Sequence, residues 1–331
     1  MHLPRPRGSL SERLLEALRH DRALTRDAAA TPDDTDDQQL SLWTLYELHY
    51  RGFAEVEDRR EWDPDLIAVR RDLEESFEDD LRAHAKPVLA LAEDVDGLPA
   101  QLEAIAGWQS EESLPGYLHR EATAEQYLEF LTQRSLYHLK ESDPHAWAVP
   151  RLEGAAKTAL AELQNDEFGG GRAEWLHSRL YAEAMESVGL DPAYGTYVDR
   201  VPSYTLAVNN AMSLFGLNRR LRGASMGHLA AFEMTSSVPC RRYLQGAQRL
   251  ELGAAVERYF DEHVEADAVH EHLAIRGICM PLVEANPPLA ADVLLGAATC
   301  ALLDGVAGDQ MVRSWRDGRS TLSPDEERNA A

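Results

Sequence analysis

The chain has 331 residues, of which 44% are hydrophobic and 27% are charged, and its formal net charge is −24. This length and composition allow a buried core in one large domain or two smaller ones. The strong negative charge argues against binding to a nucleic-acid backbone or to an anionic membrane surface. Its simplest consequence is solubility.

Cysteine usage and the apolar stretches of the chain bear on its location. Cys240, Cys279 and Cys300 are odd in number and widely spaced, so we expect no disulfide framework. The N-terminal segment lacks an apolar run of signal-peptide length, and the strongest apolar stretch, residues 293–303, is too short to cross a bilayer. These features predict a soluble cytoplasmic protein that makes no membrane contact.

The first third of the chain predicts short helices around one linker. Apolar residues recur with helical spacing at residues 9–24, 40–56 and 65–92, and a further helical segment leads to Pro115. Residues 27–39 are acidic, small and poor in apolar groups, which predicts a flexible linker.

The remainder of the chain predicts longer helices. They are expected at residues 123–141, 150–168, 202–217, 225–235, 254–276, 289–303 and 305–315. Asp143-Pro144 ends the first of them, because the residue before a proline is disfavoured in a helix. Strand-like alternation is scarce, so the sequence predicts an all-α protein.

Four segments follow from this pattern. We expect an N-terminal helix with its linker (1–39), an N-terminal helical elaboration (40–117), one packed helical bundle (118–316) and a polar tail (317–331).

The first candidate ligand motif is DEFGGGRAEWLH, residues 166–177. Glu174 and His177 have the i, i+3 spacing of carboxylate-bridged diiron proteins. Glu167 lies seven residues before Glu174, on the same face if the helix persists. Three consecutive glycines, residues 169–171, predict a π-bulge or a bend that would re-aim Glu167.

The second candidate motif lies on the predicted helix of residues 254–276. His263, Asp267 and His270 are spaced at zero, four and seven, so all three can point into one cavity. Together the two motifs offer three histidines and three carboxylates, which suits two iron ions. Carboxylates neutralise and bridge two ferrous ions, and neutral imidazoles bind iron without adding negative charge.

Three other interpretations remain open at this point. The acidic residues could form a solvated helix face without metal. Glu174 with His177 and Asp267 with His270 could be the paired motifs of a ferritin-like protein, although Asp then replaces Glu and His263 is surplus. A heme-binding or cofactorless protein would leave the carboxylates without a role.

Two further features carry weaker signals. His228 and Glu233 share a predicted helix near the expected site, and packing is the preferred interpretation for both. Five arginines form a local basic excess. The simpler explanation is ion pairing with the acidic surface, and the more specific one is that they anchor a carboxylate of the substrate. They are Arg219, Arg220, Arg222, Arg241 and Arg242.

The two ligand motifs resemble those of the heme-oxygenase-like diiron oxidases and oxygenases, often called iron-containing redox enzymes. The resemblance covers roughly residues 118–316 and implies a heme-oxygenase-like helical bundle with additional N-terminal helices. It also implies one further carboxylate ligand, which Glu141 would supply. The implied metal ligands are Glu141, Glu167, Glu174, His177, His263, Asp267 and His270.

The resemblance further implies a reaction. Two iron ions and dioxygen would act on a small-molecule substrate through a peroxo-diferric intermediate, with electrons from outside, such as from a ferredoxin or a reductase. Family members that oxygenate nitrogen resemble this chain in carrying a carboxylate at the position of Glu167, so oxygenation of an amine is expected. Desaturation or cleavage of a carbon chain is the alternative, and a non-catalytic interaction protein is a further one. We expect a homodimer as the oligomer.

Overall fold

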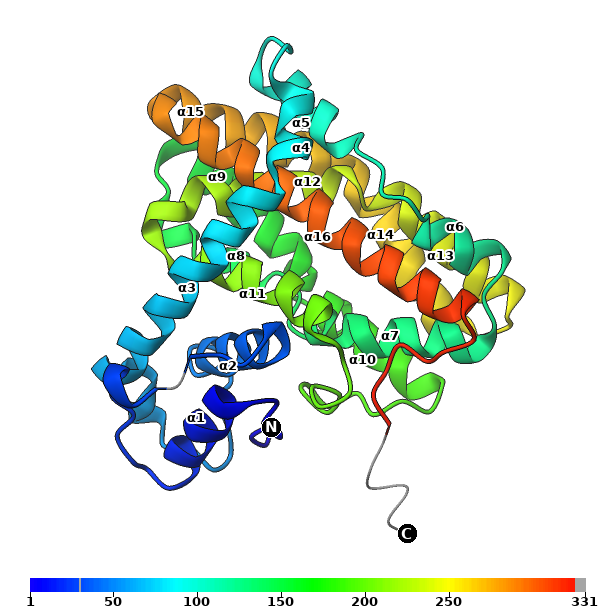
Figure 1. Ribbon diagram of the computed structural model, residues 1–331. Helices are drawn as coiled ribbons and strands as arrows, with labels where there is room; N and C mark the ends of the chain where they lie inside the picture. The colour runs from blue at the N-terminus through cyan, green and yellow to red at the C-terminus, as the bar shows by residue number, and fades with distance from the viewer. Residues whose placement is uncertain (30, 325–331) are drawn as a thin grey trace.

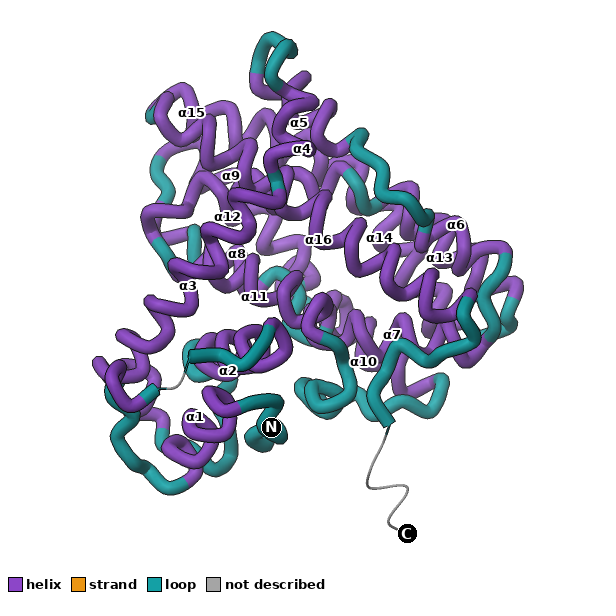
Figure 2. Tube along the Cα trace, viewed as in Figure 1, coloured by secondary structure: helices purple, strands orange, loops and turns teal. Residues whose placement is uncertain are grey.

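The computed structural model describes residues 1–29 and 31–324, and all side chains within them except those of residues 28 and 265–269. These residues form helices joined by turns and short 3₁₀ segments, with no strand among them (Figure 2). The prediction of an all-α protein is confirmed.

An N-terminal group of helices packs at one side of the molecule, lower left in Figure 1. It comprises α1 (Ser9–Arg19), α2 (Thr35–Glu47) and α3 (Pro64–His84), and its apolar side chains share a core with α11 (Ser203–Leu217). Short helices α4 (Lys86–Leu89), α5 (Leu98–Ala106) and α6 (Leu114–Arg120) then lead along the bundle.

The prediction of a flexible linker at residues 27–39 is wrong for its second half. Asp34 caps α2 by accepting a hydrogen bond from the backbone N–H of Asp37. The Asp37 carboxylate is fully buried and accepts the backbone N–H groups of Leu10 and Ser11, the first turn of α1. An acidic side chain at a helix N-terminus satisfies backbone donors that have no partner within the helix. These acidic residues therefore cap the N-termini of α1 and α2.

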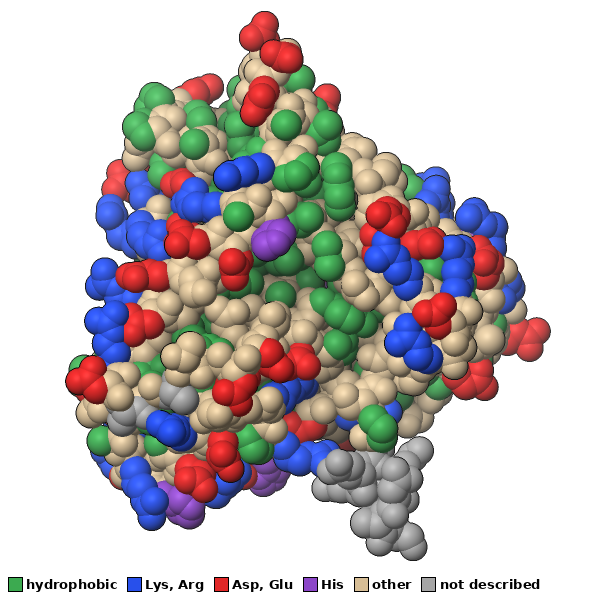
Figure 3. Space-filling view, viewed as in Figure 1, with side chains coloured by type: hydrophobic (Ala, Val, Ile, Leu, Met, Phe, Trp, Pro, Cys, Tyr) green, Lys and Arg blue, Asp and Glu red, His purple; other side chains and the backbone are tan. Residues whose placement is uncertain are grey.

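The remaining helices form the bundle. They are α7 (Ala124–His138), α8 (Asp143–Ala146), α9 (Gly154–Glu167), α10 (His177–Ser187), α11, α12 (Arg222–Met234), α13 (Ser237–Arg249), α14 (Ala254–His272), α15 (Met280–Ala285) and α16 (Ala290–Arg316). Over α11 and α16 the surface is hollowed, with hydrophobic side chains in the hollow and charged ones around it (Figure 3).

Helices α12 and α16 cross at very short range near the centre of the bundle. A Cβ atom on Gly227 would lie 1.8 Å from the backbone oxygen of Val293, and one on Gly296 would lie 1.9 Å from that of Ala224. Only glycine permits this approach at both positions, because any side chain would overlap the neighbouring backbone. The contact fixes α12, which carries Glu233, against the longest helix.

Helix α16 is one continuous helix, where the sequence predicted two. With its preceding turn it forms a stretch, Pro287–Arg316, that is long and apolar enough to suit a membrane span, contrary to our expectation from residues 293–303. Its most apolar window has a mean hydropathy of 1.7 and is 44% buried inside the molecule. The helix packs against α5, α11 and α12, as a core helix of a globular protein does.

A buried ion pair joins the N-terminal helices to the bundle. The ammonium of Lys140 pairs with the carboxylate of Glu47, and both side chains are at most 1% exposed. The same carboxylate accepts the hydroxyl of Tyr194 at 2.6 Å, and the ammonium lies 4.1 Å from the centre of the Tyr50 ring. Lys140 directly precedes Glu141, so this pair holds the turn that carries a candidate metal ligand.

Glu47→Ala should lower the free energy of unfolding by roughly 3–5 kcal/mol, because it leaves the Lys140 ammonium buried without a counter-charge. Urea unfolding followed by circular dichroism measures this loss. Glu16→Ala, on the exposed face of α1, is the control and should change stability by less than about 0.5 kcal/mol. Equal effects of the two substitutions would contradict a structural role for the buried pair.

Candidate metal centre

Helix α14 supplies both histidines of the second motif. His263 and His270 are two helical turns apart and are 6% and 2% exposed. Immediately after His270 the helix widens into a π-helical segment, Leu273–Cys279, before α15. The third predicted ligand on this helix, Asp267, lies outside the residues whose side chains are described.

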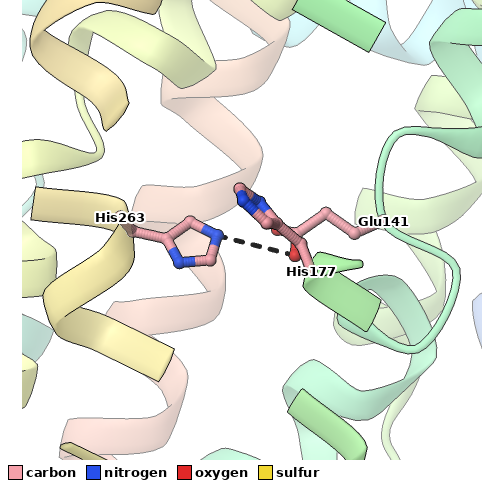
Figure 4. Close-up of side chains that lie close together, drawn as sticks. All are labelled: Glu141, His177 and His263. Carbon is pink, nitrogen blue, oxygen red and sulfur yellow. Dashed lines mark ion pairs between the residues drawn. The ribbon is translucent and has the colours of Figure 1, made fainter. Parts of the chain in front are cut away.

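One group of candidate ligands combines Glu141, His177 and His263 (Figure 4). One ligand atom from each lies within 4.8 Å of the other two, and all three side chains are buried. Within this group, Nε2 of His263 lies 3.6 Å from Oε2 of Glu141. Glu141 reaches the group from the turn between α7 and α8, where Ser142 adopts a left-handed conformation with φ of 69°.

Two neighbours orient the ligands of this first group. The hydroxyl of Tyr259 donates to Oε2 of Glu141 at 3.0 Å, and Nδ1 of His138 lies 2.8 Å from Oε1 of the same carboxylate. Nδ1 of His263 lies 2.7 Å from the backbone oxygen of Tyr259. A carbonyl oxygen only accepts, so this Nδ1 carries the proton and Nε2 presents its lone pair toward Glu141. That arrangement is typical of a metal-binding histidine.

A second buried group combines Glu167, Glu233 and His270. Nδ1 of His270 lies 3.4 Å from Oε1 of Glu167 and 3.4 Å from Oε2 of Glu233. On its other side, Nε2 of His270 lies 3.6 Å from a carboxylate oxygen of the more exposed Asp166. Glu167 and Glu233 are 7% and 5% exposed.

The interpretation of Glu233 as a packing residue is corrected by this geometry. A glutamate on an otherwise apolar helix is ambiguous by itself, and Glu233 has no ligand-spaced partner on α12. The signal that could have found it is its position in the last turn of a largely apolar, buried helix, directly after the run Leu229–Phe232, where an ionised side chain requires compensation.

Glu167 connects the two groups. Its Oε1 faces His270 of the second group, and its Oε2 lies 3.1 Å from Nδ1 of His177 of the first. That His177 nitrogen is buried and has no hydrogen-bond partner. One carboxylate between two ligand groups has the arrangement needed to bridge two metal ions.

The glycine triplet breaks the helix more completely than the sequence predicted. Gly169, Gly170 and Gly171 have φ values of 72°, 60° and 78°, so α9 ends at Glu167 and α10 begins at His177. The helix does not persist, so the condition under which Glu167, Glu174 and His177 would share one helix face is not met. Glu167 and His177 nevertheless meet, because the loop turns the chain back on itself.

Glu174 lies in a short 3₁₀ segment of this loop, Ala173–Trp175, and is exposed. The structure does not bring it into either group. Its assignment as a ligand stays a prediction, which requires the loop to change its conformation.

Burial and mutual contact shift the protonation of these side chains. Burial favours the neutral form of Glu141, but the imidazoles of His138 and His263 outweigh it and hold the pKa of Glu141 well below its usual range. Burial opposes charge on His177, but Glu167 raises the pKa of His177 above its usual value. Burial raises the pKa of Glu233, and repulsion from Glu167 adds to that effect.

Among the residues that the structure describes, no lysine or arginine pairs with the carboxylates of the centre. The ion pairs of Glu141, Glu167 and Glu233 within the described part of the chain are all with histidines. Three buried carboxylates in two adjacent groups cannot all stay ionised without compensation. Metal cations would supply it, and the mixture of imidazole and carboxylate suits ferrous iron. The residues present therefore fit a two-metal site.

A cavity of about 390 Å³ leads to the first group. His138, Glu141 and His263 form part of its lining, with aromatic side chains such as Phe130 and Tyr243 beside them. We refer to this space as the site cavity. Its volume is within the range of small-molecule binding pockets.

Comparison with known protein families also indicates an iron-binding protein. Residues 128–305, just over half of the chain, match the family described as iron-containing redox enzymes. The chain belongs to this family. Membership confirms the resemblance drawn from the two ligand motifs and identifies an iron-containing oxidoreductase with an all-α fold.

A nitrosourea synthase of Streptomyces achromogenes subsp. streptozoticus is also similar to this family member. The two proteins are 29% identical over 199 residues. The match spans 59% of this chain and 41% of the relative, so the chain covers less than half of that protein's length.

Glu233→Gln should reduce the number of ferrous ions bound per chain from two to one, because it removes a carboxylate from the second group only. Anaerobic titration with ferrous ions, followed by removal of free metal and iron analysis, measures this number. Glu162→Gln, on the exposed face of α9, should keep both ions. Retention of two ions by Glu233→Gln would show that Glu233 is not a ligand.

Proposed function

We propose that this protein is a non-heme diiron enzyme that uses dioxygen to oxygenate the nitrogen of an amine-containing small molecule. The observation that carries the proposal is the pair of adjacent, buried ligand groups that Glu167 connects. When bound there, two ferrous ions would supply electrons and open coordination positions for dioxygen.

The chain's own residues would prepare the site for this chemistry. Tyr259 and His138 hold both oxygens of Glu141, so this carboxylate keeps one orientation during turnover. The backbone oxygen of Tyr259 fixes the tautomer of His263. Metal binding requires the imidazoles to be neutral, so any proton on His177, whose pKa Glu167 raises, would leave as metal enters.

Burial also keeps water away from the site. Every side chain in the two groups is less than 10% exposed, so bulk water has little access to the reacting atoms. A substrate would approach through the site cavity, which reaches the first group beside Glu141 and His263. Exclusion of water protects reactive oxygen species from unproductive reduction.

Two observations favour nitrogen as the atom oxidised. The similar nitrosourea synthase acts in nitrogen chemistry, as its name states. Glu167 occupies a buried position between the groups, where the resemblance associates an extra carboxylate with nitrogen oxygenation. We further propose an external electron donor, a ferredoxin or a reductase, and a cytoplasmic location.

The walls of the site cavity support one second candidate. Phe130, Tyr243 and Phe260 contact one another with ring centres 4.8–6.4 Å apart, and form an apolar surface. Such a surface also accommodates a hydrocarbon chain, so oxidation of a carbon chain by the same centre is the alternative reaction.

The deciding experiment combines iron binding with oxygen consumption. Protein loaded anaerobically with ferrous ions should bind two per chain, and should consume dioxygen faster when amines are added. Mass spectrometry with ¹⁸O₂ should show one labelled oxygen on the nitrogen of the product. Loss of two hydrogens from a carbon chain, without label, would support the alternative instead.

His263→Ala should slow oxygen consumption by more than about a hundredfold while leaving helical content unchanged, since it removes a ligand of the first group. His272→Ala is the matched control, because this histidine is exposed on the same helix and should retain the wild-type rate. No iron binding by the wild-type protein, or full activity of His263→Ala, would overturn the proposal.

A further inference from the structure

A second, much smaller cavity lies among α7, α11, α12 and α16, where the surface is hollowed over α11 and α16 (Figure 3). Its volume is about 30 Å³, against about 390 Å³ for the site cavity. That volume admits about two water-sized molecules. The half-buried Val208 and Leu303 and the exposed Asp304 belong to its lining, so it reaches the surface. We refer to this space as the narrow cavity.

The wall of the narrow cavity offers little to water. Its apolar members include Val208, Met212, Leu303, Ala307 and Met311. Polar members bond to one another in two pairs, which are Arg134 with Asp304 and Gln133 with Thr205. Nδ1 of His228 and Oδ1 of Asn209 have no hydrogen-bond partner, but both atoms are themselves inaccessible to water. Cavities of this apolar character stay dry and take up apolar gases such as xenon.

One layer of side chains separates the narrow cavity from the candidate metal centre. Phe232 lines both cavities and directly precedes Glu233 of the second ligand group. Tyr137 also lines the narrow cavity, and its ring centre lies 5.3 Å from that of Phe232 and 5.1 Å from that of His138. Nδ1 of His138 in turn lies 2.8 Å from the carboxylate of Glu141. Burial raises the pKa of Tyr137, and the three carboxylates of the centre add to that effect, so the phenol lies close to all three.

We propose that the narrow cavity is a path by which small apolar gases, dioxygen among them, reach the metal centre separately from the organic substrate. The inference rests on the proposed function for the use of dioxygen. A substrate in the site cavity occupies the space beside Glu141 and His263, so dioxygen that arrives after it needs another entry. A diatomic gas fits the narrow cavity in size and polarity, whereas a charged amine fits it in neither. Because side chains in packed interiors still change rotamer, a diatomic molecule can pass the layer of Tyr137 and Phe232.

The first measurement locates gas in the protein without any reaction. Crystals of the full-length protein are pressurised with xenon, an apolar atom that marks the cavities that gases enter. Xenon should occupy the narrow cavity, in contact with Ala307 and Met212. Ordered water in that space, or the absence of xenon from it, would overturn the inference whatever the protein does with iron.

The second measurement follows a gas to the iron. Nitric oxide resembles dioxygen in size and polarity and binds ferrous iron without turnover, so stopped-flow absorbance of the ferrous-loaded protein gives its rate of arrival. Ala307→Leu on α16 and Val208→Phe on α11 fill the narrow cavity from two walls. Each should slow nitric oxide binding by about tenfold or more, because a packed interior has few other voids. Val306→Leu is the matched control, since this neighbouring valine is exposed and lines neither cavity, and it should keep the wild-type rate.

The outcomes separate this inference from the proposed function. Slower nitric oxide binding in the filled variants, at unchanged iron content, would support the gas path even in a protein that oxidises no amine, a result that would overturn the proposed function alone. Wild-type rates in filled variants would overturn the gas path and leave the chemistry intact, because the gas would then enter through the site cavity. If one substitution disturbs folding, the other variant and the xenon structure still decide the question.

Discussion

The main physical constraint on this molecule is the burial of three carboxylates that, among the residues the structure describes, form ion pairs only with histidines. Glu141, Glu167 and Glu233 come from three separate parts of the bundle, and folding forces their negative charges together. Without a cation, protonation must offset part of this charge: burial raises the pKa of Glu233, and Glu167 raises the pKa of His177, whereas the neighbouring imidazoles keep the pKa of Glu141 low. Burying these charges costs stability in the absence of metal, and bound metal would offset that cost.

The buried pair of Glu47 and Lys140 shows how the same chain treats charge where no metal is expected. There, one oxygen of the carboxylate receives both an ammonium and a tyrosine hydroxyl, so a buried cation offsets its charge. Because Lys140 and Glu141 are neighbours, one turn contacts both the buried ion pair and the candidate metal centre. The N-terminal helices, which contain no candidate ligand, therefore contribute to the metal centre by holding the turn that presents Glu141.

Much of this arrangement could be predicted from the sequence. Helical spacing located His263 and His270, and the resemblance supplied Glu141, because ligands on regular helices and in known motifs leave a pattern in the chain. The glycine triplet predicted a bend, but the course of the loop could not be read from helical spacing, because that spacing ceases to apply where successive residues adopt positive φ. Glu233 was missed for another reason: its partners come from α9 and α14, and only tertiary packing brings them together.

The close crossing of α12 and α16 makes that tertiary packing specific. Gly227 and Gly296 let the two backbones touch, and this contact sets the depth at which α12 places Glu233 within the bundle. A side chain at either position would push α12 outward and would carry Glu233 away from His270. The second ligand group therefore depends on two residues with no chemistry of their own.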